Sequence, residues 1–254
     1  PTSGATVTVK LGAKKDGTIV AAHSTLMFQA GAFAGSPINP GCMCGFALYD
    51  IENIDVLGYD VVSNRPKVAA YRAPGAPIAS FAVESALDDL AAKLGMDPLA
   101  LRQKNMAKNG TKTHYGPTHQ NIGFEQVLAV TQEHPHWKSP LPAGQGRGLA
   151  CGFWFNIGGE STATVHINED GSVTIATGSP DIGGSRASMG MMVAEVLGID
   201  VSRVRATVAD TASIGFTHLT GGSRVTFATG MAATQAAEKV VAELKKRAAM
   251  IWEI

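Results

Sequence analysis

One tetrapeptide, Gly-Gly-Ser-Arg, occurs twice in the chain, at residues 183–186 and at residues 221–224. Each copy follows a strand and turn pattern and opens a run of small and apolar residues that is typical of a helix. The first turn of a helix has free N–H groups and a partial positive charge, and glycine lets a ligand approach the backbone closely. Two such loops could therefore bind phosphate or another anion.

Helix packing is a second explanation for both loops. Small residues after each loop would let two helices pack closely, with Ser185 and Ser223 as helix caps. Asp210 and Thr211 could orient the second loop, as ordinary turn residues also do. Neither loop matches the GxGxxG pattern of dinucleotide folds or the GxxxxGK[ST] pattern of nucleoside triphosphatases. The tetrapeptides alone leave anion binding and helix packing open.

An arginine stands in a third segment of small residues, AAYRAPGAP at 69–77. Beside such a turn, Arg72 could hold an anion through several hydrogen-bond donors. It could equally form an ion pair with Glu84 or Asp88 of the helix that follows. These two interpretations again remain open.

The elements that position these loops follow from the hydrophobic pattern. Apolar and polar residues alternate on both sides of Asp16-Gly17, which predicts a β-hairpin. Residues 53–64 predict a further strand. Helical spacing predicts helices within 76–96, 97–106 and 123–134, with Asp97 as the cap of the second. Two segments rich in Gly, Pro or polar residues are predicted as loops: 31–45 and 107–123.

A Pro- and Gly-rich stretch at 134–148 is the best internal boundary. After it, strands are predicted within 149–157, 161–178 and 201–210, with Asp170-Gly171 as a turn. Helices are predicted to begin near Gly184 and Gly222. The expected fold class is α+β, or mixed α/β, and the expected domains are residues 1–135 and 146–254, joined by a linker at 136–145.

The amino-acid composition argues against several classes of protein. Hydrophobic residues make up 45% and charged residues 17% of the 254 residues, so a large core can form. Lys and Arg total 21, as do Asp and Glu, which argues against nucleic acid as a partner. No apolar run reaches about 18 residues, so no membrane span is predicted. Three cysteines are too few for a disulfide framework, which predicts free thiols and a cytoplasmic protein.

The histidines share no spacing typical of metal ligands, so no metal site built from side chains is predicted. His114 and His119 lie in polar loop sequence and are expected in solvent. Both ends of the chain look like cuts in a longer protein.

Four segments, in this order, resemble the molybdopterin-binding subunit of the xanthine dehydrogenase/aldehyde oxidase family of molybdenum hydroxylases. Residues 49–105 resemble its Y-x-I-x-N…R-x-x-G-x-P…E…G-x-x-P-x-x-x-R-x-x-N block. GRGLACGFWF resembles the segment that opens its second molybdenum domain. INEDGSVTIATGSPDIGGSR and VADTASIGFTHLTGGSRVTFATGMA resemble its two glycine-loop segments. The resemblance covers nearly the whole chain.

The resemblance implies that loops from two domains close around one molybdenum–molybdopterin, often in its cytosine dinucleotide form. Two glycine loops on one extended anion then make chemical sense. Three sets of residues would contact it. Tyr71, Arg72 and Ala73 would face the molybdenum pocket. Gly183, Gly184 and Ser185 would lie beside the dithiolene and oxo ligands. Gly221, Gly222, Ser223 and Arg224 would hold the phosphate end or the pterin.

The resemblance also implies an oxidoreductase that hydroxylates a small-molecule substrate, either an aldehyde or an aromatic N-heterocycle, with oxygen from water. Its electrons would pass to iron–sulfur and FAD partner subunits. Many relatives have glutamine at the position of Gly184. The general-base glutamate of the family has no counterpart here, so no catalytic residue is predicted within the chain. The chain would then act together with the rest of the molybdopterin-binding subunit. Alternatively, it would be a non-catalytic fragment, split subunit or assembly module that is inactive alone.

Overall fold

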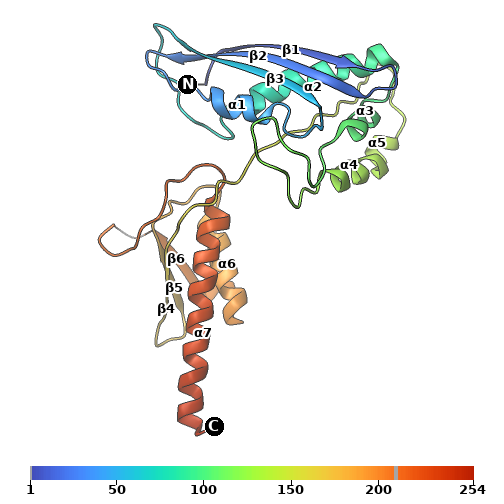
Figure 1. The fold of residues 1–254 in the computed structure, drawn as a ribbon. Helices are drawn as coiled ribbons and strands as arrows, with labels where there is room; N and C mark the ends of the chain where they lie inside the picture. The colour runs from blue at the N-terminus through green and yellow to red at the C-terminus, as the bar shows by residue number, and fades with distance from the viewer. Residues whose placement is uncertain (1, 209–210) are drawn as a thin grey trace. The chain divides into compact units, whose positions relative to one another are not determined.

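The computed structural model describes residues 2–208 and 211–254, and Figure 1 shows the elements they form. The chain divides into two compact units, Pro1–Trp154 and Phe155–Ile254. Each unit contains a three-stranded sheet with packed helices and has its own hydrophobic core. The predicted α+β class is therefore confirmed. The assignment of residues 1–135 and 146–254 to two cofactor-binding domains stays a prediction.

The sheet of the first unit has the strand order β1-β2-β3. Strands β1 (Ala5–Ala13) and β2 (Ile19–Gly31) are antiparallel, which confirms the hairpin predicted around Asp16-Gly17. The Asp16 carboxylate accepts the backbone N–H of Thr18 and so closes the turn. Strand β3 (Asn53–Val62) lies parallel to β2.

The helices of the first unit are α1 (Ile38–Cys44), α2 (Ala76–Leu94), α3 (Pro98–Asn105), α4 (Phe124–Glu133) and α5 (Pro135–Lys138). Asp97 caps α3 as predicted, because its side chain accepts the backbone N–H of Ala100. Figure 1 shows α2 lying along the sheet.

Helix α1 corrects the prediction of an irregular loop over residues 31–45. Pro37 is its N-cap and Pro40 lies in its first turn, where a helix needs no N–H donor, so neither proline opposes helix formation. Ile38 and Gly41 are buried, and a Cβ on Gly41 would lie 3.2 Å from the Phe28 ring of β2. Tertiary packing, and not the local sequence pattern, therefore determines that residues 38–44 form a helix.

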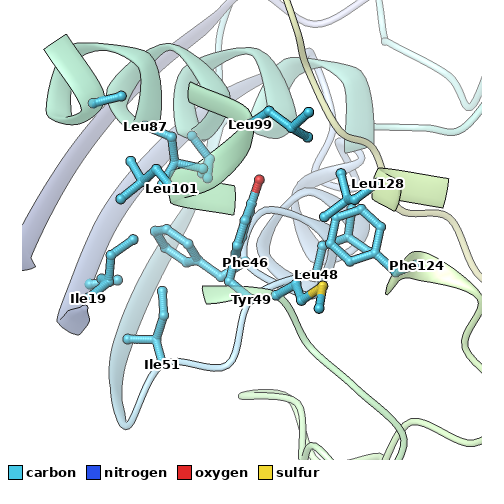
Figure 2. Packing of buried hydrophobic residues seen from close by; sticks show 14 residues of the cluster. Ile19, Phe46, Leu48, Tyr49, Ile51, Leu87, Leu99, Leu101, Phe124 and Leu128 are labelled. Atoms are coloured by element: carbon cyan, nitrogen blue, oxygen red, sulfur yellow. The ribbon is translucent and has the colours of Figure 1, made fainter. Parts of the chain in front are cut away.

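The larger core of the first unit gathers side chains from β2, α2, α3, α4 and the segment that follows α1. Figure 2 shows Phe46 and Tyr49 among leucines of α2 and α3. Leu149, Cys151 and Phe153 also pack against this core. Residues 149–157 do not form the predicted strand, and the first part of this segment packs on the core instead.

The loop at 107–123 is tied down by two histidines, which corrects their prediction as solvated side chains. His114 Nε2 lies 2.9 Å from the carbonyl oxygen of Cys42, and His119 Nε2 lies 2.7 Å from that of Ala47. Both acceptors belong to the α1 region, about 72 residues earlier in the chain. The loop is therefore part of the packed unit.

The second unit lacks the predicted strand within 149–157, and the predicted strand segment at 161–178 forms two strands; the helix, strand and helix predicted after it are present. Strands β4 (Ala163–Ile167) and β5 (Val173–Thr177) form an antiparallel hairpin around Asp170-Gly171. Helix α6 (Ser185–Leu197) and a 3₁₀ turn (Val201–Arg203) lead to β6 (Val204–Val208), which is parallel to β5. A π-helical turn (Val225–Thr229) precedes α7 (Gly230–Trp252). Among the helices that the structure describes, none combines the length and apolar character needed to cross a membrane.

Candidate functional site

The second unit brings its two glycine loops to one edge of its sheet. Because β5 and β6 are parallel, their carboxyl ends lie at the same edge, which is where open sheets with helical crossovers bind ligands. Residues 178–184 follow β5 and lead into α6, and residues 211–224 precede the π-helical turn before α7. Since β4 is antiparallel to β5, residues 157–162 approach the same edge. Three loops therefore meet there.

The first glycine loop leaves open space at the start of α6. Gly183 and Gly184 have φ of 65° and 80°, left-handed conformations that favour glycine. No atom lies within 4 Å of a Cβ built on either residue. Their N–H groups donate to no acceptor within residues 2–208 and 211–254. Two backbone donors beside a helix start are thus available to an anionic ligand.

A carboxylate already occupies part of this helix start. Asp181 accepts the backbone N–H of Arg186 at 3.1 Å and the hydroxyl of Ser185 at 3.3 Å, and it forms an ion pair with the Arg186 guanidinium. The hydrogen bond from the Arg186 N–H is the main reason that the pKa of Asp181 is lowered. Gly184, rather than Ser185, is the N-cap of α6, so the capping role considered for Ser185 is wrong.

The second glycine loop is packed instead of open. A Cβ on Gly222, whose φ is 66°, would lie 1.7 Å from Cγ1 of Ile157. The Gly222 carbonyl accepts the N–H of Ile157, and the Ser223 carbonyl accepts the side-chain amide of Asn156. Ser223 does not cap a helix, since the N-cap of the π-helical turn is Arg224. Asp210 lies outside the described residues. Packing of two chain segments therefore explains why the second copy of the tetrapeptide has glycine at position 222.

Arg224 holds the loops together from inside. Its side chain is buried, with 1% exposure. Its guanidinium donates to the carbonyls of Gly158, Glu160 and His218 and to the hydroxyl of Ser161. A guanidinium has five N–H donors, so few remain for a phosphate. Arg224 builds the site by fixing the backbone around it.

The third predicted segment belongs to the first unit. Tyr71 and Arg72 are exposed, and Ala73 is half-buried with a left-handed φ of 47°. Gly75, the N-cap of α2, also has positive φ, and a Cβ there would lie 2.2 Å from the Pro37 carbonyl oxygen. Close contact with the segment before α1 thus shapes this turn.

Arg72 has no ion-pair partner in the part of the chain that the structure describes. The two carboxylates considered as its partners, Glu84 and Asp88, both bind Arg102 at 2.8 Å. Pairing of Arg72 with either is therefore wrong. Its guanidinium remains available to a ligand.

Arg102 and Glu84 belong to a buried polar cluster. The Glu84 carboxylate also accepts the Tyr49 hydroxyl and the backbone N–H of Cys151. Burial, followed by the charge of Glu84, raises the pKa of Tyr49. Burial lowers the pKa of Arg102, but the charges of Glu84 and Tyr49 and the hydrogen bonds to Glu84 and Asp88 together outweigh burial and raise this pKa. Nearby, Asn105 accepts the N–H of Ile19 and donates to the carbonyl of Gly17.

Tyr49, Glu84, Arg102 and Asn105 are all letters of the sequence pattern in residues 49–105. Sequence reasoning considered only Glu84, as a partner of Arg72, and predicted no role for the other three. Charged and amide side chains facing the apolar side of predicted helices were the available signal. The structure assigns them to the framework that carries the turn at 71–75.

The thiols are not nucleophile candidates. All three cysteines are free, and burial raises the pKa of Cys44 to about 11. Burial, followed by the nearby Glu84 charge, raises the pKa of Cys151 to about 11 as well. At neutral pH both are therefore protonated and unreactive.

The donors present fit a pterin cofactor better than a bare metal ion. Within the described ranges, no group of three or more His, Cys, Asp or Glu side chains could hold a metal ion. Molybdopterin binds its metal through its own dithiolene sulfurs, so the protein must supply hydrogen-bond donors for an extended anion. The open N–H groups of Gly183 and Gly184 in the second unit are donors of that kind.

Two molybdopterin cofactor-binding domain models match the chain, over residues 2–106 and 120–254. Aldehyde oxidoreductase of Megalodesulfovibrio gigas is 31% identical over 94% of this chain and 28% of its own length. The xanthine dehydrogenase molybdenum-binding subunit of Escherichia coli is 28% identical over 79% of this chain and 29% of its own length. The chain thus spans less than a third of the length of these curated relatives.

Solved structures of molybdenum hydroxylases are similar to this chain as well. Aldehyde oxidoreductase from Desulfovibrio gigas matches with a TM-score of 0.78 and 30% identity, over 94% of this chain and 28% of that protein. The enzyme from Desulfovibrio desulfuricans matches with a TM-score of 0.78 and 28% identity over the same shares. The chain therefore belongs to the molybdopterin cofactor-binding domains of the xanthine dehydrogenase/aldehyde oxidase family of molybdenum hydroxylases.

Proposed function

We propose that this chain binds molybdenum–molybdopterin as part of an oxidoreductase that hydroxylates an aldehyde or an aromatic N-heterocycle. The observation that carries the proposal is the open loop before α6, where Gly183 and Gly184 offer unpaired N–H groups at the carboxyl edge of a parallel strand pair. Relatives named aldehyde oxidoreductase and nicotine 6-hydroxylase large subunit support the substrate classes.

Each predicted site segment has a proposed part. The N–H groups of Gly183, Gly184 and Ser185 bind the cofactor beside its dithiolene, where a side chain would block approach. The exposed Arg72, with Tyr71 and Ala73, faces the molybdenum pocket. Gly221, Gly222, Ser223 and Arg224 shape the phosphate or pterin end through the backbone that they hold in place. When bound, the molybdenum centre supplies two-electron oxidation of the substrate.

The remaining parts of the proposal concern the whole enzyme. We propose the cytosine dinucleotide form of the cofactor, and iron–sulfur and FAD partner subunits as electron acceptors. The chain has no counterpart of the family's general-base glutamate. Catalysis then requires the rest of the molybdopterin-binding subunit, and the chain alone shows no turnover.

The test is a bulky side chain at Gly184, compared with the same change at Gly198. These glycines lie at opposite ends of α6, both with positive φ, and no atom lies within 4 Å of a Cβ on either. Backbone strain is therefore matched between Gly184→Leu and Gly198→Leu, at roughly 1–2 kcal/mol each. Only Gly184→Leu should lower molybdenum and pterin content per folded molecule, in native protein from a host that makes molybdopterin. Equal cofactor content in the two variants would contradict the proposed role of this loop in cofactor binding.

A further inference from the structure

A buried chain of hydroxyl groups connects the three loops of the second unit. Thr229 has no exposed surface, and its hydroxyl lies 2.8 Å from that of Ser179 and 2.9 Å from that of Ser161. Ser179, also fully buried, lies in the loop after β5, and Ser161 lies in the segment before β4. Arg224 donates to the Ser161 hydroxyl at 2.7 Å. One residue, Thr229, therefore joins the first glycine loop to the other two.

The local backbone places this hydroxyl. Thr229 ends the π-helical turn, directly before α7 begins. π-Turns are rare and occur often at functional sites, because the extra residue redirects the side chains of one helical turn. At the next position, a Cβ on Gly230 would lie 2.6 Å from Sδ of Met192, so α7 packs tightly on α6 from its first residue. The turn thus lets Thr229 reach the loops while α7 keeps its contact with α6.

The loop held by Thr229 is the one with open donors. Its start is fixed by the Ser179 hydroxyl, by the Ser179 N–H bound to Thr177, and by Gly178, whose Cβ would lie 2.7 Å from Ile214. Its end is fixed by Asp181 at the start of α6. Beyond these anchors, the space beside Gly183 and Gly184 is open.

We infer that Thr229 is a positioning residue for the cofactor site: through Ser179, its hydroxyl holds residues 178–184 in the conformation that leaves the Gly183 and Gly184 N–H groups available. The inference rests on the proposed function. It adds a residue outside the predicted set, one that touches no cofactor and acts through the loop.

The test compares Thr229→Val, which keeps the shape but loses the hydroxyl, with Thr229→Ser, which keeps the hydroxyl. Thr226→Val is the matched control, because Thr226 lies exposed on the same π-helical turn and its side chain forms no hydrogen bond with the described residues of the loops. Native protein from a host that makes molybdopterin is dialysed, and two quantities are measured: molybdenum retained per folded molecule, and hydrogen exchange of residues 178–184.

Thr229→Val should lose molybdenum up to about tenfold faster than wild type, the upper end of the effect of one hydrogen bond between neutral groups, and its loop should exchange faster. Thr229→Ser and Thr226→Val should retain molybdenum and exchange amide hydrogens at the wild-type rates. If Thr229→Val does not fold, Ser179→Ala removes the same bond from the loop side and should give the same two effects. If wild type contains molybdenum, and Thr229→Val retains as much molybdenum and exchanges as slowly at residues 178–184, the inference about Thr229 is wrong and the proposed function stands. Wild type without molybdenum and pterin overturns the proposed function itself.

Discussion

At the residue scale, burial explains most polar residues that mark this chain. Arg102 and Glu84 have almost no exposed surface, and each is stable there because the other neutralises it and the remaining donors and acceptors are used. Arg224 satisfies its guanidinium with backbone carbonyls in the same way. The residues proposed to bind the cofactor are instead small or exposed: Gly183, Gly184 and Arg72.

His114 should make stability depend on pH. Burial lowers its pKa below the ordinary 6.5, its Nε2 bonds to the Cys42 carbonyl, and its buried Nδ1 has no hydrogen-bond partner among residues 2–208 and 211–254. Between the lowered pKa and 6.5, the unfolded chain binds more protons than the folded one, so stability falls as pH decreases through this window. Urea unfolding between pH 7.5 and about 5 should therefore show a decreasing free energy of unfolding, and His114→Gln should flatten that slope.

The control is His136→Gln, which changes an exposed imidazole outside the packed loop. It should leave the slope unchanged. A wild-type slope that survives in the His114→Gln variant would place the titrating group elsewhere.

At the scale of elements, one tetrapeptide serves two purposes because its surroundings differ. Both copies lie at the carboxyl edge of parallel strands and precede helices that pack on each other. The copy before α6 faces open space, whereas Ile157 fills the space beside Gly222. Glycine suits both places, because at position 184 it leaves room for the proposed cofactor and at position 222 it allows close packing of two segments.

Alanine at the two glycines should separate these purposes. Gly184→Ala adds only backbone strain, roughly 1–2 kcal/mol, whereas Gly222→Ala adds the same strain and about 1–3 kcal/mol from overpacking against Ile157. Hydrogen exchange of the β5 amides reports the stability of the second unit and should show the larger loss for Gly222→Ala.

In an Ile157→Ala background, the losses caused by the two alanines should become nearly equal, because only the strain and a 3.2 Å contact with the Cβ of residue 157 then remain at position 222. Unequal losses in that background would mean that another neighbour, rather than Ile157, requires glycine at position 222.

At the scale of the whole molecule, each unit has its own core, and the segment after the proline-rich stretch belongs to the first. Leu149 and Phe153 pack on that core, and the Cys151 N–H donates to the buried Glu84 carboxylate. The first compact unit therefore extends to Trp154, beyond the predicted linker at 136–145.

Truncation should show where the first unit ends. Residues 1–154 produced alone should fold, and residues 1–145 should be less stable by roughly 3–5 kcal/mol, from lost apolar burial and one hydrogen bond to a charged group. Urea unfolding of the two pieces measures the difference. Equal stabilities would mean that residues 146–154 contribute nothing to the first unit.

Local signals in the sequence were enough for much of this fold. The hairpins at Asp16-Gly17 and Asp170-Gly171, the cap at Asp97 and the helices after both glycine loops depend on neighbours within a few residues, so their patterns predict them. The order of four segments was enough for the family, because a family pattern is itself a property of the sequence.

Only the tertiary structure decided what each glycine, arginine and histidine does. Helix α1 forms in a Pro- and Gly-rich segment because its small residues fit against β2 and the turn before α2, and the segment at 149–153 is not a strand because it packs on the first core. Arg102, and not Arg72, forms the ion pairs with Glu84 and Asp88. Each of these outcomes depends on a partner far away in sequence, and local pattern carries no information about which distant side chain will occupy a given space.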